Sequence, residues 1–300
     1  MSLPFDPERV EGLKKLVVFQ NGFGENGVHG KNTSSGYVAV FDSKNHEMKM
    51  EEYLGDYFSV GCGVLLARFE KPIKYLEKTA RNILDYFEQG RSTRRLIGTM
   101  GGGIHYITFY KISEAQDSEF AVGEHLVLIH CGPRKLSETG VHKTITGNAK
   151  RNRKVLLDLV QEKAGQKAKL LFDKIHNSIE SEAENITYRR GVVKIRPGEL
   201  TIIPSSMADD AVLVRARDEV SELSDSLPQA TGRVFTGRDR EELYFLDGKP
   251  GNIYFPLSMD IEHYNSQLPQ NFRKLEDVLP QLGKYIEIKA VLKPTATVIE

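Results

Sequence analysis

The sequence predicts an α+β fold, in which short strands and amphipathic helices are mixed along one chain. Segments rich in β-branched and aromatic residues alternate with turn-forming residues along most of its length. Helix-patterned segments interrupt them, but without the strict alternation that a doubly wound sheet requires. No internal repeat or low-complexity linker divides the chain, so we expect a single domain over residues 1–300.

The first predicted strands are residues 36–42 (GYVAVFD) and 57–69 (YFSVGCGVLLARF). Glycines on either side of Cys62 indicate a bulge or a close approach of two backbones at that point. Two further strands are predicted at 98–111, where a glycine run precedes alternating residues, and at 125–132.

Three helices are predicted from apolar residues spaced by three and four. The first covers 73–87, after Pro72, and ends at Gly90. The second covers 148–163 and the third about 271–281. Between and after these helices, alternating residues predict short strands in GVVKIR, ELTIIP, AVLVRA, GNIYFPL and YIEIKAVLKP, with a hairpin turn at Asp247-Gly248.

The charge balance and the two cysteines limit the partners and the cellular location that we expect for the protein. Forty-one basic residues balance forty-one acidic ones, so any contact with nucleic acid must be local. No stretch approaches the roughly 20 apolar residues that cross a bilayer, so we expect no membrane partner. Two distant cysteines indicate no disulfide framework, which favours the reducing cytoplasm. The sequence indicates no particular protein partner.

Cys62, His105, His130 and His176 form a candidate metal site, because each stands in a short segment marked by Gly, Asn or Arg. A thiolate with imidazoles suits zinc, manganese or iron, and such ligands can leave one coordination position open for chemistry. Spacing alone does not distinguish this site from scattered surface or core histidines. The other four histidines are assigned no functional role: His29, His46, His142 and His263.

The four candidate ligands lie in segments that resemble, in the same order, the segments of a known protein family. The matching segments are VGCGV (60–64), GTMGGGIHYI (98–107), HCGPRKL (130–136), NRK (152–154), IHNSIESE (175–182), YRRGVVKIRPGELTIIPSSM (188–207) and QATGRVFTGRDREE (229–242). In this order they resemble the metal-binding and nucleotide-binding segments of the RtcB family of RNA ligases, and LPQNFRKLEDVL with IEIKAVLKP resembles the family's C-terminal end.

The resemblance implies an RtcB-like domain of mixed sheets flanked by helices. Such ligases join RNA 3′-phosphate or 2′,3′-cyclic phosphate ends to 5′-hydroxyl ends in RNA repair and tRNA splicing. They use GTP and manganese, and a histidine of the protein becomes guanylated. By position, the resemblance implies four metal ligands, Cys62, His105, His130 and His176, and six nucleotide-binding residues, Asn177, Ser205, Ser206, Met207, Gly232 and Arg233.

This chain departs from the family pattern at chemically important positions. Ser59 replaces a metal-binding aspartate, which leaves either a manganese site or a single Cys-His₃ site that suits zinc. Gln229 occupies the place of the nucleophilic histidine, and an amide nitrogen has no available lone pair. Ile104 and Thr108 replace nucleotide-contacting asparagine and glutamate. Self-guanylation from GTP is therefore not expected.

A local basic segment is the candidate contact for RNA. Seven basic residues and one acidic residue lie between Arg134 and Lys154, beside the His130 segment. Such a density can neutralise several phosphates, although a solvated helix start and loop would carry the same charges. The residues assigned to RNA are Arg134, Lys135, Arg151 and Arg153.

Three interpretations remain open from the sequence. The first is an RNA end-processing enzyme with altered chemistry. The second is a catalytically silent protein that keeps the metal to bind RNA ends. The third is a purely structural metal that joins distant strands.

Overall fold

The computed structural model describes residues 12–19, 36–44, 60–89, 97–100, 105–132, 142–232, 253–254 and 269–300. Helices and strands both occur, with strands in the majority, so the predicted α+β class is confirmed at that level. The expected hairpin at Asp247-Gly248 lies outside the described residues. Among the residues described, no helix has the length and apolar character needed to cross a membrane.

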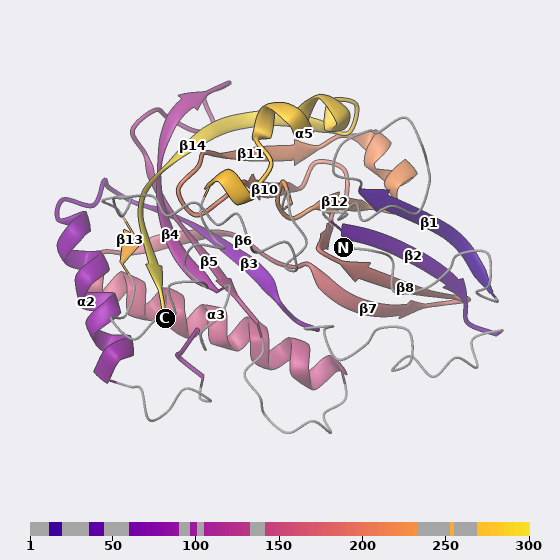
Figure 1. The fold of residues 1–300 in the computed structure, drawn as a ribbon, viewed down its shortest axis with the longest axis horizontal. Coiled ribbons are helices and arrows are strands. Elements are labelled where there is room, and N and C mark those ends of the chain that lie inside the picture. The colour runs from indigo at the N-terminus through magenta and orange to yellow at the C-terminus, as the bar shows by residue number, and fades with distance from the viewer. Residues whose placement is uncertain are drawn as a thin grey trace.

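A large antiparallel sheet forms the centre of the molecule (Figure 1). Its strand order is β10-β11-β14-β4-β5-β3-β6, and short β13 pairs in parallel with β14. The strands are β3 (Gly63–Phe69), β4 (Tyr106–Ala115), β5 (His125–Cys131), β6 (Ala168–Ile175), β10 (Leu200–Pro204), β11 (Ala211–Ala216), β13 (Ile253–Tyr254) and β14 (Ile286–Ile299).

A smaller antiparallel sheet lies to one side, with the order β1-β2-β8-β7, and β12 pairs with β9 beside it. These strands are β1 (Leu13–Phe19), β2 (Gly36–Asp42), β7 (Asn177–Glu182), β8 (Asn185–Arg190), β9 (Val192–Lys194) and β12 (Ser226–Pro228). The described helices are α2 (Leu76–Gln89), α3 (His142–Ala164) and α5 (Leu275–Leu282), with 3₁₀ helices at Asp218–Leu223 and Pro269–Asn271.

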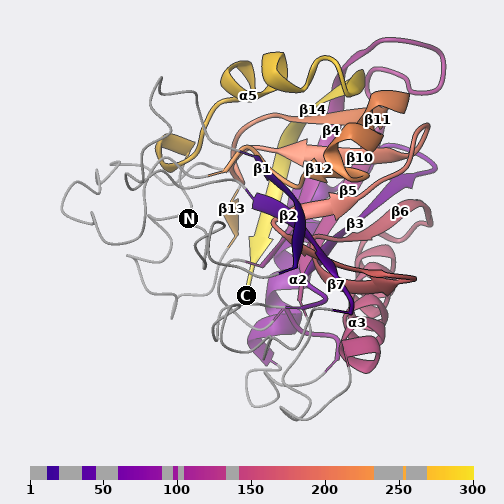
Figure 2. The same cartoon turned by 90° about the vertical axis from the view of Figure 1, so that its right-hand side faces the viewer.

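Alternation along β3 builds two cores on opposite faces of the large sheet. Leu65, Ala67 and Phe69 face α2 and α3, whose apolar stripes cover that side. Val64 and Leu66 face the other side, where they share a core with Ile202 of β10 and Leu213 of β11. Because β3 and β10 stand near opposite ends of the strand order, the sheet must curl toward itself (Figure 2).

An ion pair helps to hold the two ends of the curled sheet together. Lys174 of β6 lies 2.6 Å from the carboxylate of Glu199, which directly precedes β10. On the outer side of β10, β11 and β14, helix α5 covers a third core, into which Ile203, Val212 and Leu282 are buried.

Among the predicted element boundaries that differ from the structure, two differ for identifiable local reasons. The strand expected from residue 57 begins at Gly63, because Gly61 has φ +88°, a left-handed conformation that ends the extended chain. The helix expected from 148 begins at His142 and continues through Gly147. Glycine lowers helix propensity, but burial of Leu156 and Val160 along the same helix offsets that cost.

Gly63 allows the backbones of β3 and β6 to come close together, as the glycines on either side of Cys62 predict. A Cβ at this position would clash with the carbonyl oxygen of Lys174 and lie 2.9 Å from Ile175 Cα. We expect Gly63→Ala to lower the free energy of unfolding by about 1–3 kcal/mol, because the two strands must separate. Urea unfolding followed by circular dichroism would measure this change.

Gly147→Ala is the matched control, because a Cβ there meets no atom within 4 Å. In this helical position alanine should raise the free energy of unfolding by about 0.5–1 kcal/mol. Equal effects of the two substitutions would contradict a close approach at Gly63.

Candidate metal centre

Three predicted metal ligands meet at one end of three adjacent strands. Cys62 directly precedes β3, His130 lies near the end of β5, and His176 directly follows β6. Gly63 is paired with Cys131 on one side and with Ile175 on the other, which brings the neighbouring ligands together. The backbone N–H of His176 also donates to the carbonyl of Cys62 at 2.9 Å.

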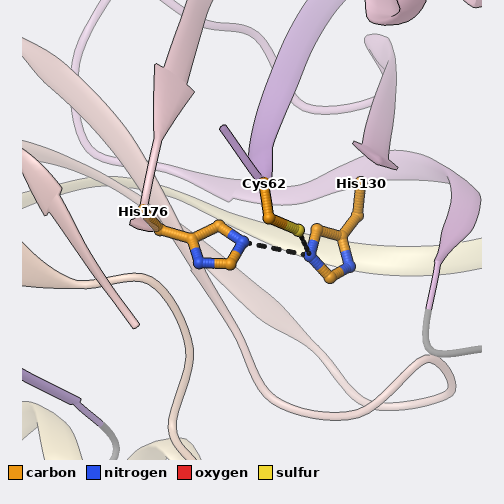
Figure 3. A group of neighbouring side chains, drawn as sticks. All are labelled: Cys62, His130 and His176. Atoms are coloured by element: carbon orange, nitrogen blue, oxygen red, sulfur yellow. Dashed lines mark hydrogen bonds between the residues drawn. The ribbon is translucent and has the colours of Figure 1, made fainter. Parts of the chain in front are cut away.

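The side chains of Cys62, His130 and His176 form a buried group, called here the Cys-His-His cluster. Cys62 Sγ lies 3.4 Å from His130 Nε2, which lies 3.1 Å from His176 Nε2. Figure 3 shows the two imidazoles directed toward each other beside the thiol. All three ligand atoms lie within 4.8 Å of one another, so the group could hold a metal ion.

These separations are close to those of ligands around a tetrahedral zinc ion. Bonds of about 2.3 Å to sulfur and about 2.0 Å to nitrogen place S and N about 3.5 Å apart and two N atoms about 3.3 Å apart. The Cys62–His130 and His130–His176 pairs are therefore within a few tenths of an ångström of the spacing that such an ion requires.

His105 lies beside the cluster and is not part of it. Its Nε2 is 3.5 Å from Cys62 Sγ, but it does not belong to the group whose ligand atoms all lie within 4.8 Å. The structure thus brings Cys62, His130 and His176 into one group, and His105 as the fourth ligand of a Cys-His₃ site stays a prediction. Gly132 lies against both His105 and Cys62, because a Cβ there would be 3.3 Å from His105 Nε2 and 3.5 Å from Cys62 Sγ.

Hydrogen bonds at the far side of two rings orient their Nε2 lone pairs. His105 Nδ1 lies 3.0 Å from the Met100 carbonyl oxygen, which can only accept a hydrogen bond. His176 Nδ1 lies 3.3 Å from Asn177 Oδ1, which also accepts from the Gly191 N–H. Both neutral imidazoles must then carry the proton on Nδ1, which leaves Nε2 free to bind a metal.

Burial keeps the Cys62 thiol and the His176 imidazole uncharged near neutral pH. It raises the pKa of the Cys62 thiol to about 12, with Cys131 adding to the shift and Arg153 opposing it. Burial also lowers the pKa of His176 to about 3, and the positive charge of Arg153 acts in the same direction. The thiol must therefore lose its proton when a cation binds, whereas His176 is already in its metal-binding form.

Arg153, predicted to contact RNA, lies in the interior, and that prediction is corrected. Its side chain has no exposed surface and bonds to Asp173 and to the carbonyls of Gly61 and Cys131. Neighbouring Arg151 is exposed on α3, so its predicted contact with RNA stays a prediction. Arg134 and Lys135 lie outside the described residues.

The predicted nucleotide-binding residues occupy structural positions near one another. Ser205 donates to the Arg273 carbonyl at 2.8 Å, and Ser206 donates to Asp209 at 2.9 Å. The carbonyl of Met207 accepts from Thr297, whose hydroxyl is 2.9 Å from that of Thr108.

The structure also places two further residues of the predicted nucleotide site, Gly232 and Asn177. The Gly232 carbonyl accepts from the backbone N–H of Arg273, and Asn177 contacts His176 as described above. Arg233, Ser59 and Ile104 lie outside the described residues.

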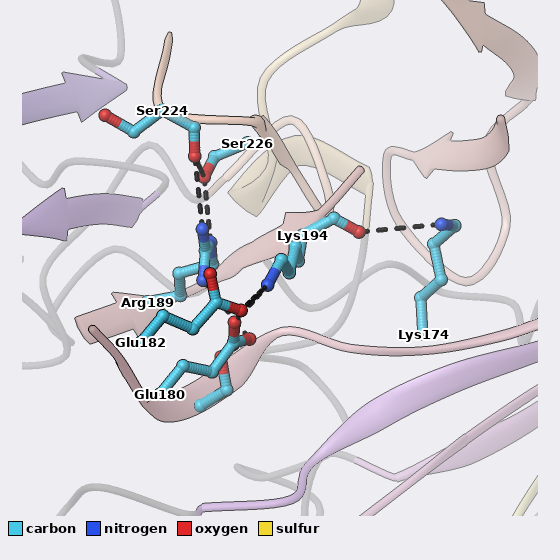
Figure 4. Close-up of polar contacts among 8 residues, drawn as sticks. Lys174, Glu180, Glu182, Arg189, Lys194, Ser224 and Ser226 are labelled. Carbon is cyan, nitrogen blue, oxygen red and sulfur yellow. Dashed lines mark hydrogen bonds and ion pairs between the residues drawn. The ribbon is translucent and has the colours of Figure 1, made fainter. Parts of the chain in front are cut away.

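A polar network fixes the strand that follows His176 (Figure 4). Arg189 of β8 is buried and bonds to Ser226 Oγ, the Ser224 carbonyl and the carboxylate of Glu180 on β7. Lys194 of β9 pairs with both Glu180 and Glu182. These contacts join β7 and β8 to the β9-β12 pair.

No protein-family model matches this chain, and no curated protein sequence matches it significantly. The resemblance to the RtcB family is therefore a proposal, which rests on the motif segments of this chain and on the geometry of the cluster.

Sequence reasoning missed the residues that hold the ligands. The buried position of Arg153, which was assigned to RNA, could have been predicted, because Arg153 is three and seven residues before the buried Leu156 and Val160 and so shares their helix face. Its partner Asp173 lies on β6, a strand that the sequence did not predict. The bonds of Met100 and Gly191 come from their backbones, and the sequence carries no signal for them.

We expect the protein to bind one equivalent of zinc or cobalt(II). Cys62→Ser and His176→Ala should each weaken binding by at least about tenfold, measured by competition with a chromophoric chelator. Cys131→Ala and His125→Ala remove a buried thiol and an imidazole outside the cluster and should leave the stoichiometry at one. If the two controls lose metal binding and Cys62→Ser and His176→Ala keep it, the ion binds outside the cluster.

Metal binding should release about one proton per ion at pH 7, because the Cys62 thiol must ionise whereas His176 is already neutral. Below the pKa of this thiol, each unit decrease in pH should weaken the apparent affinity about tenfold. Calorimetry in buffers of different ionisation enthalpy would count the protons. A value near zero would mean that the thiol stays protonated and is not a ligand.

Proposed function

We propose that this protein is a divalent-metal protein of the RtcB type that acts on RNA ends carrying a 3′-phosphate or a 2′,3′-cyclic phosphate. The observation that carries the proposal is the Cys-His-His cluster. Its members come from three separate motif segments, and their ligand atoms lie within 4.8 Å of one another. A cytoplasmic location accords with this function, because RNA is present there and a free thiol stays reduced.

Three protein ligands suit a reactive metal better than a purely structural one. Structural zinc sites have four protein ligands, whereas catalytic sites have three and leave a position for water or substrate. A metal bound here would polarise a phosphoryl oxygen of the RNA end. Zinc accords best with the sulfur and nitrogen ligands, while the manganese implied by the family prefers oxygen ligands, and the cluster contains no carboxylate.

Gln229 lies close to the cluster and cannot serve as a nucleophile. Its backbone N–H donates to the Gly191 carbonyl at 3.1 Å, and the Gly191 N–H donates to Asn177, which contacts His176. The side-chain oxygen of Gln229 is buried and accepts no hydrogen bond from the described residues. It could accept a hydrogen bond from a bound RNA end, but an amide cannot take up a guanylate.

The same residue favours a second function, that of a protein that binds RNA ends without chemistry. In this alternative the metal binds the terminal phosphate, the buried amide oxygen accepts from the ribose 2′-hydroxyl beside it, and no covalent intermediate forms. Exposed Lys150, Arg151 and Lys154 on α3 would contribute contacts to RNA phosphates in either case.

We expect a short RNA with a 3′-phosphate to bind at least about tenfold more tightly than the same RNA with a 3′-hydroxyl. The preference should disappear in Cys62→Ser, and fluorescence anisotropy would measure it at several salt concentrations. Lys154→Gln should reduce the salt dependence without changing the preference, because it touches only backbone phosphates. Equal affinity for both ends in the metal-loaded protein would reject the proposal.

Incubation with GTP and manganese should give no covalent guanylate, because Gln229 has no nucleophilic nitrogen. Intact-mass spectrometry would detect an adduct directly. A guanylated protein would show that another residue serves as nucleophile and that the chain is a ligase of the family's usual type. Turnover of a cyclic phosphate end without an adduct would separate the enzyme from the silent binder.

A further inference from the structure

We infer that Arg153 is the positioning residue of the metal centre, because its single guanidinium holds all three strands that carry the Cys-His-His cluster. The inference rests on the metal site of the proposed function and adds the group that sets its geometry. Arg153 touches none of the ligand side chains in the contacts described, and it acts through the backbone and through Asp173.

Two of its hydrogen bonds end next to ligands. Arg153 Nη1 donates to the Gly61 carbonyl at 3.0 Å and to the Cys131 carbonyl at 2.8 Å. Gly61 directly precedes Cys62, and Cys131 directly follows His130. One nitrogen atom therefore bridges the backbones beside Cys62 and His130.

The third contact reaches the strand of the remaining ligand. Arg153 Nε lies 2.7 Å from Asp173 Oδ1, on β6 three residues before His176. The arginine side chain is fully buried and that of Asp173 is 16% exposed. In such surroundings an ion pair with further hydrogen bonds is strongly directional, and loss of one partner leaves the other charge unpaired.

The residue before Arg153 extends the same function to His105. Asn152 is buried, accepts from the Gly98 N–H and donates to the Thr99 carbonyl at 3.0 Å. The next residue, Met100, provides the carbonyl that orients His105. Two consecutive residues of α3 thus contact the backbone beside Cys62 and His130, the Asp173 side chain on the strand that leads to His176, and the backbone next to the carbonyl that orients His105.

The planar shape of the guanidinium is essential to this function. Its donors point in fixed directions toward two carbonyls and one carboxylate, whereas a lysine ammonium is a compact charge that cannot reach all three. Metal affinity depends on ligand positions within about half an ångström, so a loosened backbone should weaken binding even where the fold survives.

The test is cobalt(II) binding to the full chain, followed by absorption spectroscopy. The thiolate charge-transfer band and the ligand-field bands report ligand geometry, which a purely structural role would not change. Arg153→Lys should weaken cobalt affinity by at least about tenfold and shift these bands. Lysine keeps the charge and most of the packing, so the comparison isolates the fork of donors.

Arg189→Lys is the matched control. Arg189 is also buried and bonds to a carboxylate, a serine hydroxyl and a carbonyl, but it joins β8 to β7 and β12 and contacts no backbone group beside a ligand. It should lower the midpoint of thermal unfolding and leave the cobalt spectrum and affinity unchanged. Equal spectral shifts in both variants would reduce Arg153 to a general packing residue and overturn the inference.

If Arg153→Lys does not fold, Asp173→Asn decides. It keeps the arginine and both carbonyl bonds and weakens only the anchor to β6, so it should weaken cobalt binding through His176. If a folded Arg153→Lys protein binds cobalt with the affinity and spectrum of the wild type, the inference is overturned but the metal centre stands. If Arg153→Lys does not fold, the same result with Asp173→Asn has the same meaning. Failure of the wild-type protein to bind cobalt would overturn the metal centre and the proposed function with it.

Discussion

The buried ion pair between Arg153 and Asp173 is the constraint on which the rest of the site depends. A charge inside an apolar core is unfavourable unless it is paired, and here the partners are two backbone carbonyls, of Gly61 and Cys131, and the carboxylate of Asp173. Because α3 packs over Leu65 of β3 and Ile129 of β5, the Arg153 side chain can reach its partners at only one position of the helix along the sheet. Packing and electrostatics therefore specify one arrangement, and the ligands follow from it.

The curled sheet gives the site its burial. One face of β3 packs against the helices, and the other packs against β10 and β11 from the far end of the same sheet. The cluster lies where β3 ends and the chain passes from β6 into the smaller sheet at His176. Glycines at 61, 63 and 132 make this crossing possible, because side chains there would meet the helix, the neighbouring strand or the ligands themselves.

Much of this organisation could be predicted from sequence, and the exceptions have physical reasons. The strand at Gly36–Asp42 was predicted with its observed bounds, since β-branched and aromatic residues dominate it. Strands β6 to β8 were not predicted, because Lys174, Glu180 and Arg189 interrupt their apolar pattern and are stabilised by ion pairs with distant residues. For the site, the residue types indicated the ligands. Which of them form the Cys-His-His cluster, with His105 beside it, depends on strand register, which the sequence does not specify.

The cluster also links the ion to the folding of the whole chain. Its contacting ligands are separated by 68 and 46 residues, and each pair meets only after β3, β5 and β6 have aligned. An unfolded chain would offer these groups one at a time, without a chelate, so an ion would bind the native state almost exclusively. Non-local strand pairing of this kind is slow to form. The metal would thus bind after the strands have paired and would stabilise the folded state. The fraction of protein molecules that hold an ion would then measure the fraction in which the sheet has formed.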